Sequence, residues 1–239
     1  MLCSLTGGIP WQKFFKLQEK NTVVSDQHIR IRFRFQKIGV LRFISHHDLM
    51  RLFERAIRRA DIPICMSQGF NPRPKMSFPM ALALGVEGVD EVIELELSRW
   101  IAPSKLQENL RAQLPPDLVI ISAEPITPKG PSTVEELVYR IEGDLSEGIT
   151  REKIDEFLTG EKFQVLREKK GGRKFFNLRS SIVSIALENS ALLLRLRPTK
   201  EGMARPDEVL DALGQKMGTD STLRITRSAV HLSSPHEDN

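Results

Sequence analysis

Residues Arg42–Phe78 read RFISHHDLMRLFERAIRRADIPICMSQGFNPRPKMSF, and this stretch predicts a capped helix followed by an irregular loop. Ser45 precedes the first apolar residue of the helical pattern. Asp48 follows three positions later, which is the arrangement of an N-cap with an acidic N3 residue. Pro63 limits how far the helix can run. One face of the helix is apolar at three- and four-residue spacing: Leu49, Leu52, Phe53, Ala56, Ile57 and Ala60.

Arginines occupy the opposite face of this helix, and Arg59 follows Arg55 by four residues. Like charges at that spacing cost roughly 0.2–0.5 kcal/mol, so the face is either an ordinary solvated one or is arranged to bind phosphate. From Arg30 to Lys75 there are eleven lysines and arginines against three acidic residues, a net charge of +8, whereas the whole chain carries +4. Because the excess is local, it favours an anion-binding surface. The predicted contact residues here are Arg42, Ser45, His46, Arg51, Arg55, Arg58 and Arg59.

Titratable residues in the same stretch allow more than one interpretation. Asp48 is explained by the cap alone, because an acid at N3 faces the helix dipole and unpaired amides. If the chain is an enzyme, Asp48 or Asp61 is the candidate acid, base or nucleophile. His46 and His47 diverge by about 100° on a helix, so they predict no metal site. His46, next to the cap, can contact a phosphate or donate to a loop carbonyl.

The loop from Ser67 to Lys75 combines restricted backbone geometry with positive charge. Gly69 permits a positive φ, and the two prolines hold the residues before them extended. Phe70 stands among polar neighbours, so it either stacks on a nucleic-acid base or tucks into the core of a tight turn. The predicted contact residues of the loop are Gly69, Phe70, Asn71, Arg73 and Lys75.

The pattern of the remaining chain predicts an α+β protein in two similar halves. Residues 28–36, HIRIRFRFQ, alternate apolar and basic residues, which predicts a half-buried strand whose arginines either face solvent or extend the basic surface. Each half begins strand, helix, strand and ends strand, proline-opened helix, strand. This order predicts two ferredoxin-like α/β sandwich halves, in tandem or sharing a sheet. The expected organisation is a disordered leader at 1–27, a basic domain at 28–123, a proline-rich linker at 124–134, a second domain at 135–231 and a disordered tail at 232–239.

Composition excludes several classes of protein. Two cysteines, Cys3 and Cys65, give no cluster-binding motif and no disulfide framework, so we expect a cytoplasmic chain with no cofactor or metal of its own. The apolar runs are shorter than a membrane span, and the first 27 residues lack a signal-peptide core. No phosphate loop, dinucleotide fingerprint, HExxH or nucleophile elbow is present, which favours a non-catalytic protein.

Several motifs match one family: RFISHxDLxR from Arg42, ERAxRRA from Glu54, and SxGFNPxP from Ser67. The chain resembles the radical SAM-linked protein family over roughly residues 28–228, most specifically in its first half. His47 departs from the leucine expected there, and Asn177 from an expected aspartate, which puts any acidic role at 177 in doubt. Members of this domain-of-unknown-function family are fused to, or encoded beside, radical SAM proteins. Genes for an E/G-type ribonuclease and for ribosomal proteins often lie nearby. The resemblance therefore implies a radical SAM partner, which carries any iron–sulfur cluster, S-adenosylmethionine or cobalamin.

Three functions follow as expectations. The first is an RNA-binding accessory module that works with a separate radical SAM enzyme in tRNA or rRNA modification or processing. The second is a protein-interaction module whose basic face docks on a radical SAM partner without RNA contact. The third is an RNA-modifying enzyme in its own right. Nucleic acid that co-purifies with the chain separates the first from the second, and activity without a partner identifies the third.

Overall fold

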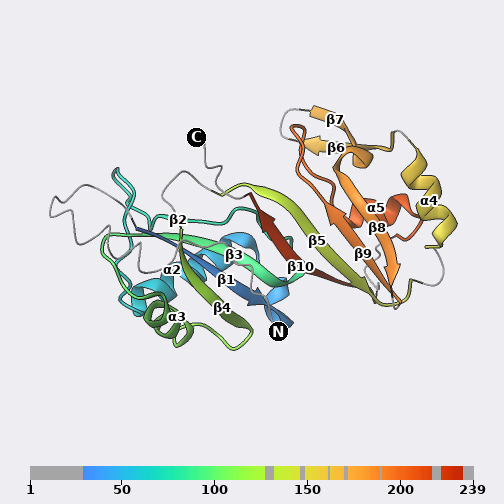
Figure 1. Ribbon diagram of the computed structural model, residues 1–239. Helices are drawn as coiled ribbons and strands as arrows, with labels where there is room; N and C mark the ends of the chain where they lie inside the picture. Colours follow the sequence, from blue (N-terminus) through green and yellow to red (C-terminus); the bar gives the residue numbers. More distant parts are fainter. Residues whose placement is uncertain are drawn as a thin grey trace, which may run out of the picture.

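The computed structural model describes residues 29–126, 132–145, 149–160, 162–169, 172–188, 190–216 and 222–233. Figure 1 shows an elongated molecule whose two halves lie end to end along one large mixed sheet. The first half contains β1 (Ile29–Lys37), the 3-10 helix η1 (Gly39–Phe43), α2 (His46–Arg59), β2 (Met76–Ser77), β3 (Glu87–Leu97), α3 (Pro103–Arg111) and β4 (Leu118–Ile126). The second half contains β5 (Val134–Glu142), α4 (Arg151–Thr159), β6 (Gln164–Lys169), β7 (Gly172–Asn177), η2 (Leu178–Ser181), β8 (Ile182–Glu188), β9 (Ala191–Leu196), α5 (Pro206–Ala212) and β10 (Arg224–Leu232).

Helix α2 confirms the cap and the apolar face expected from the sequence. The Ser45 hydroxyl accepts a hydrogen bond from the backbone N–H of Asp48 at 3.1 Å and donates to its carboxylate at 2.7 Å. The apolar side chains Leu49, Phe53, Ala56 and Ile57 are buried. In β1 the alternation is confirmed as well, because its apolar residues from Ile31 onward lie in the core. The apolar faces of α2 and β1 thus pack into the same hydrophobic core.

The strand order runs β4-β1-β3-β10-β5-β9-β8, and β2 also pairs with β3. Within the first half the order is β4-β1-β3-β2, and within the second it is β10-β5-β9-β8, with every one of these pairs antiparallel. The halves join where β10 runs parallel to the start of β3, at Thr226–Glu87 and Arg227–Gly88. β2 takes the later part of the same β3 edge, pairing at Leu95. Strands of both halves therefore belong to one sheet.

Two hydrophobic cores lie along this sheet. One joins β1, β3 and β4 to α2 and α3, and the other joins β5, β9 and β10 to α4 and α5. The side chain of Arg227 lies between them, bonded to Glu91 and close to Tyr139. Arg227 pairs with Tyr139 of the second core, and its partner Glu91 pairs with Phe35 of the first core. Because paired residues point to the same face of a sheet, both helical layers cover one face.

Some boundaries differ from the sequence predictions. β4 continues to Ile126, three residues past the predicted end of the first domain, and pairs with β1 throughout. Strand β8 was not predicted, and β10 runs on to Leu232. Residues 1–28, 127–131 and 234–239, which hold the predicted leader, the middle five residues of the predicted linker and most of the predicted tail, lie outside the described residues. Among the described helices none is long and apolar enough to cross a membrane.

Candidate nucleic-acid interface

The predicted arginine face of α2 is exposed to solvent. Arg51, Arg55, Arg58 and Arg59 all project away from the core. Arg51 lies 3.6 Å from Asp48, and Arg59 donates to the carbonyl oxygen of Gln113 at 2.8 Å. Arg55 and Arg58 make no ion pair or hydrogen bond with any other residue that the structure describes. These guanidinium groups are thus available to an external anion.

The predicted loop is the tip of a short hairpin. An isolated bridge joins Met66 to Pro74. Next to it, the backbone N–H of Ser67 donates to the carbonyl oxygen of Arg73 at 2.8 Å, and the backbone N–H of Arg73 donates to the hydroxyl of Ser67 at 2.9 Å. Gly69 adopts φ +119°, a region that favours glycine.

At this tip Phe70 is completely exposed, with a relative accessibility of 106 %, so the alternative in which it tucks into the core is wrong. Asn71 and Arg73 are exposed beside it, whereas Lys75 is held by Glu96 at 2.8 Å. The hairpin therefore presents an aromatic ring, an amide and one arginine to solvent.

The rest of the basic segment is neutralised by acidic residues of β3. Arg30 bonds to Glu94 at 2.6 Å, and Arg32 shares the same carboxylate. Arg34 pairs with Asp90 at 2.5 Å. The local charge of +8 thus overstates the basic surface, because β3 supplies the counter-charges from another part of the sequence. The arginines of β1 do not extend the basic surface as one interpretation of the pattern expected.

Arg42 belongs to a buried polar junction between the halves. The carboxylate of Glu87 is 2 % exposed and accepts from Arg42 at 3.3 Å, from Arg224 at 2.5 Å and from the backbone N–H of Gly39 at 3.1 Å. Burial alone would raise the pKa of Glu87, but these donors, Arg224 foremost, hold that pKa below its ordinary value. Arg42 therefore has a structural partner in Glu87, although part of its side chain still faces solvent.

A second buried carboxylate, Glu91, pairs with Arg227, which also donates to the carbonyl oxygens of Ala81 at 3.1 Å and Met80 at 3.2 Å. Burial would lower the pKa of Arg227, but bonding to Glu91 outweighs it and raises that pKa. Lys37 lies buried nearby, and desolvation lowers its pKa although Glu91 opposes the shift. These groups were not predicted as a site, because their partners are 136 residues apart in the chain.

His46 lies at the edge of this junction and not in the exposed arginine face. Its ring meets Phe78 edge-on at 5.2 Å, and its Nδ1 atom is buried with no hydrogen-bond partner among the described residues. Burial, and then the charges of His47, Lys37 and Arg227, lower the pKa of His46. Asp48 caps the start of α2 while Asp61 follows its end, about 20 Å away by helix geometry, so the two acids do not form one site. Ser45 is occupied by the cap.

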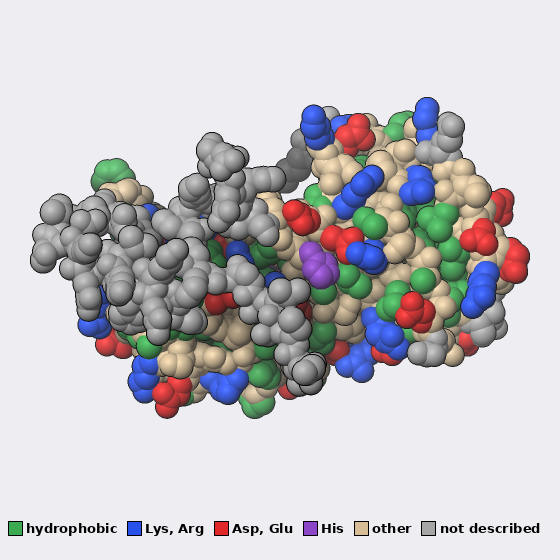
Figure 2. Space-filling model, in the orientation of Figure 1, with side chains coloured by type: hydrophobic (Ala, Val, Ile, Leu, Met, Phe, Trp, Pro, Cys, Tyr) green, Lys and Arg blue, Asp and Glu red, His purple; other side chains and the backbone are tan. Residues whose placement is uncertain are grey.

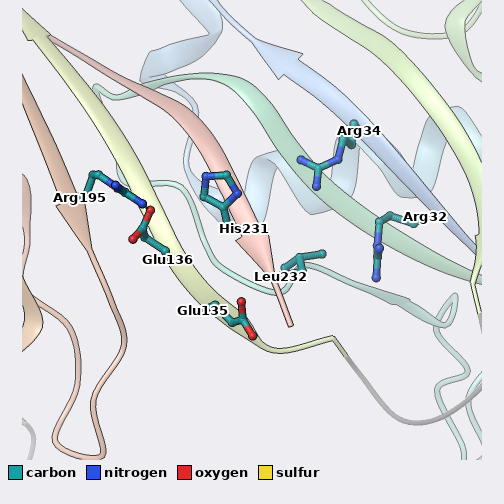
Figure 3. A pocket seen from close by; sticks show the side chains of 7 residues that line it. All are labelled: Arg32, Arg34, Glu135, Glu136, Arg195, His231 and Leu232. Atoms are coloured by element: carbon teal, nitrogen blue, oxygen red, sulfur yellow. The ribbon is translucent and has the colours of Figure 1, made fainter. Parts of the chain in front are cut away.

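A hollow of about 410 Å³ opens where β3 and β10 diverge, on the face opposite the helices (Figure 3). Arg32 and Arg34 line it from the first half, and Glu135, Glu136, Arg195, His231 and Leu232 from the second. Arg195 is paired with Glu136 at 2.8 Å. Each of the three arginines that line the hollow is paired with a carboxylate, so the hollow is not strongly basic. Among the described residues no three His, Cys, Asp or Glu side chains gather to hold a metal ion.

Sequence comparisons relate the chain to one family. No curated protein matches it. The family model described as an uncharacterized protein conserved in bacteria matches residues 30–206, which include the α2 helix and the Phe70 hairpin. The chain therefore belongs to the bacterial family DUF2344.

Proposed function

We propose that this chain is an RNA-binding protein that works with a separate radical SAM enzyme in tRNA or rRNA modification or processing. The observation that carries the proposal is the complete exposure of Phe70 at the tip of a bonded hairpin. A phenylalanine in this position contributes nothing to the core, but its ring is held ready to stack on a base.

Positive charge supports the same proposal. Four exposed arginines on α2 and Arg73 on the hairpin come from the same half of the molecule as Phe70. Guanidinium groups bind phosphate oxygens, and aromatic rings stack on unpaired bases, so the combination suits single-stranded or loop RNA better than a regular duplex. An acidic protein partner would match the arginines, and an exposed phenylalanine can also anchor a protein interface, so the salt titration below is what separates the two functions.

The architecture suits such a module. We propose that each half is a ferredoxin-like unit, since the strand orders β4-β1-β3-β2 and β10-β5-β9-β8 follow the same pattern with two helices on one face. The radical SAM partner rests on the resemblance of the Arg42–Phe78 motifs, and it would supply the cluster chemistry. The third expectation, an enzyme in its own right, has Asp48 or Asp61 as its candidate residue, and the carboxylate of Asp48 already accepts a hydrogen bond from the Ser45 cap.

The test is a salt titration of binding to an oligouridine of about 15 nucleotides. Replacing Arg51, Arg55 and Arg58 together with alanine should lower the salt slope by about two, since each phosphate contact on a single strand contributes about 0.7. Phe70→Ala should weaken binding by about 1–3 kcal/mol with the slope unchanged. All four side chains are exposed, so melting temperatures should stay near that of the wild type.

A matched control replaces three exposed basic residues elsewhere, Arg99, Arg151 and Lys200, with alanine. This variant has the same net charge as the α2 variant and should keep the wild-type slope. If both variants lose slope equally, binding is diffuse and α2 is not the phosphate contact. If neither α2 nor Phe70 matters, protein docking becomes the better explanation of this surface.

A further inference from the structure

A second basic and aromatic element lies in the other half of the molecule. The β6–β7 hairpin forms its own two-stranded sheet between α4 and β8, and the main sheet does not pair with it. Figure 1 places it at the top of the second half, apart from α2 in the first half. From Lys162 to Lys174 the sequence holds six lysines and arginines against one acidic residue, Glu168. A segment of 13 residues thus carries more net positive charge than the whole chain.

One face of the hairpin fixes it to the protein. Phe176 is 3 % exposed and Val165 packs against the same core. The guanidinium of Arg167 donates two hydrogen bonds to the Glu208 carboxylate, at 2.7 and 2.5 Å, and one to the carbonyl oxygen of Met203 at 2.8 Å. The same guanidinium lies over the Phe176 ring at 3.9 Å. The hairpin is therefore held in a defined position, although it protrudes beyond the main sheet.

The opposite face presents apolar and basic side chains together. Leu166 and Phe175 stand directly across from each other in the ladder, and they are 48 % and 61 % exposed. The neighbouring pair on this face is Glu168 and Arg173, an exposed ion pair at 3.0 Å. Lys174 is exposed too, but it stands across from Arg167 and so belongs to the other face of the hairpin. Figure 2 shows Lys and Arg side chains next to hydrophobic ones over this end of the second half.

We infer that the outer face of the β6–β7 hairpin is a second RNA-binding element, in which Phe175 stacks on an unpaired base and Arg173 contacts a phosphate. The side chains of Leu166 and Phe175 lie side by side across the two strands and together offer an apolar surface on which a base can stack. Leu166 lies next to Phe175 but leaves most of the ring accessible. The surface ion pair with Glu168 costs little to exchange for phosphate, because exposed pairs contribute little stability.

This inference rests on the proposed function and specifies its substrate. Two binding elements in different halves of an elongated protein can grip two parts of one folded RNA. The substrate class is then a folded RNA with at least two exposed single-stranded regions, as tRNA has. Occupying both elements should bind such an RNA more tightly than either element alone.

The experiment compares two probes, unfractionated tRNA and the oligouridine of about 15 nucleotides, on the full chain. Arg173→Ala should lower the salt slope for tRNA by about 0.7, as expected for one phosphate contact. Phe175→Ala should weaken tRNA binding about 5- to 150-fold without changing the slope. Oligouridine, which can also use α2 and Phe70, should be affected less. Two variants serve as controls: Phe43→Ala removes a ring that is also 61 % exposed, and Arg151→Ala removes the same charge as Arg173→Ala.

The outcomes separate the two proposals. If hairpin variants with wild-type melting temperatures bind tRNA like the wild type, while α2 and Phe70 variants fail, the hairpin inference is wrong and the proposed function stands. If Phe43→Ala weakens binding as much as Phe175→Ala, stacking at this hairpin is also refuted. If the wild type binds neither probe, the proposed function fails and the inference fails with it.

Discussion

The buried pair of Glu91 and Arg227 should be the largest single electrostatic contribution to the stability of the sheet junction. Their side chains are 4 % and 1 % exposed, so either charge left alone is poorly solvated. Removing one partner of such a pair costs about 3–5 kcal/mol. The two removals should differ. Glu91→Leu leaves Arg227 next to buried Lys37 without a carboxylate, bonded only to neutral oxygens of Ala81, Met80 and Tyr139 among the described residues. Arg227→Leu leaves Glu91 with Lys37 as a counter-charge.

We therefore expect Glu91→Leu to cost near 5 kcal/mol and Arg227→Leu near 3 kcal/mol, with the double variant costing less than their sum. The assay is urea unfolding of the wild type, both single variants and the double variant, followed by circular dichroism. Single costs below about 1 kcal/mol, or strict additivity of the two, would show that the pair is solvated and would refute the reasoning.

Three further outcomes are expected. Gly88→Ala should destabilise the protein by about 2 kcal/mol or more, because the added Cβ would lie 2.5 Å from the Glu91 carboxyl group. Gly160→Ala should not, because the nearest atom to its added Cβ is 3.6 Å away. Thermal unfolding of both variants tests this difference. The lowered pKa of His46 means that the unfolded chain binds this proton more readily, so the unfolding free energy should fall as the pH drops below about 6.5. His46→Gln should flatten this dependence in urea titrations between about pH 8 and pH 5. Elemental analysis of the purified chain should find well below one equivalent of iron or zinc, and a full equivalent would contradict the absence of a metal-binding group among the described residues.

Local patterns predicted the elements whose stability depends on local chemistry. The cap at Ser45 and the apolar stripe of α2 could be identified from spacing, and so could the alternation in β1. The order of elements indicated two similar halves, but periodicity could not show that β10 joins β3, because that pairing links residues far apart in the chain. β8 was missed because a short apolar run between polar turns gives a weak signal.

The candidate site was predicted only in part, and for an electrostatic reason. A count of charges along the chain treats Arg30, Arg32 and Arg34 as a basic surface, yet Glu94 and Asp90 of β3 neutralise them across the sheet. The acidic alternation of β3 was visible in the sequence, and matching it with the basic alternation of β1 would have indicated the pairing. The exposure of Phe70 depends on how the hairpin sits on the fold, which composition does not show.

The position of β10 has a consequence for biosynthesis. The ribosome makes β10 after every other described strand, yet it lies between β3 and β5 in the middle of the sheet. Until it emerges, the start of the β3 edge is unpaired and Glu91 has no arginine to neutralise it. The nascent chain must therefore hold an open sheet edge through most of its translation, which is the state that trigger factors and other ribosome-associated chaperones protect.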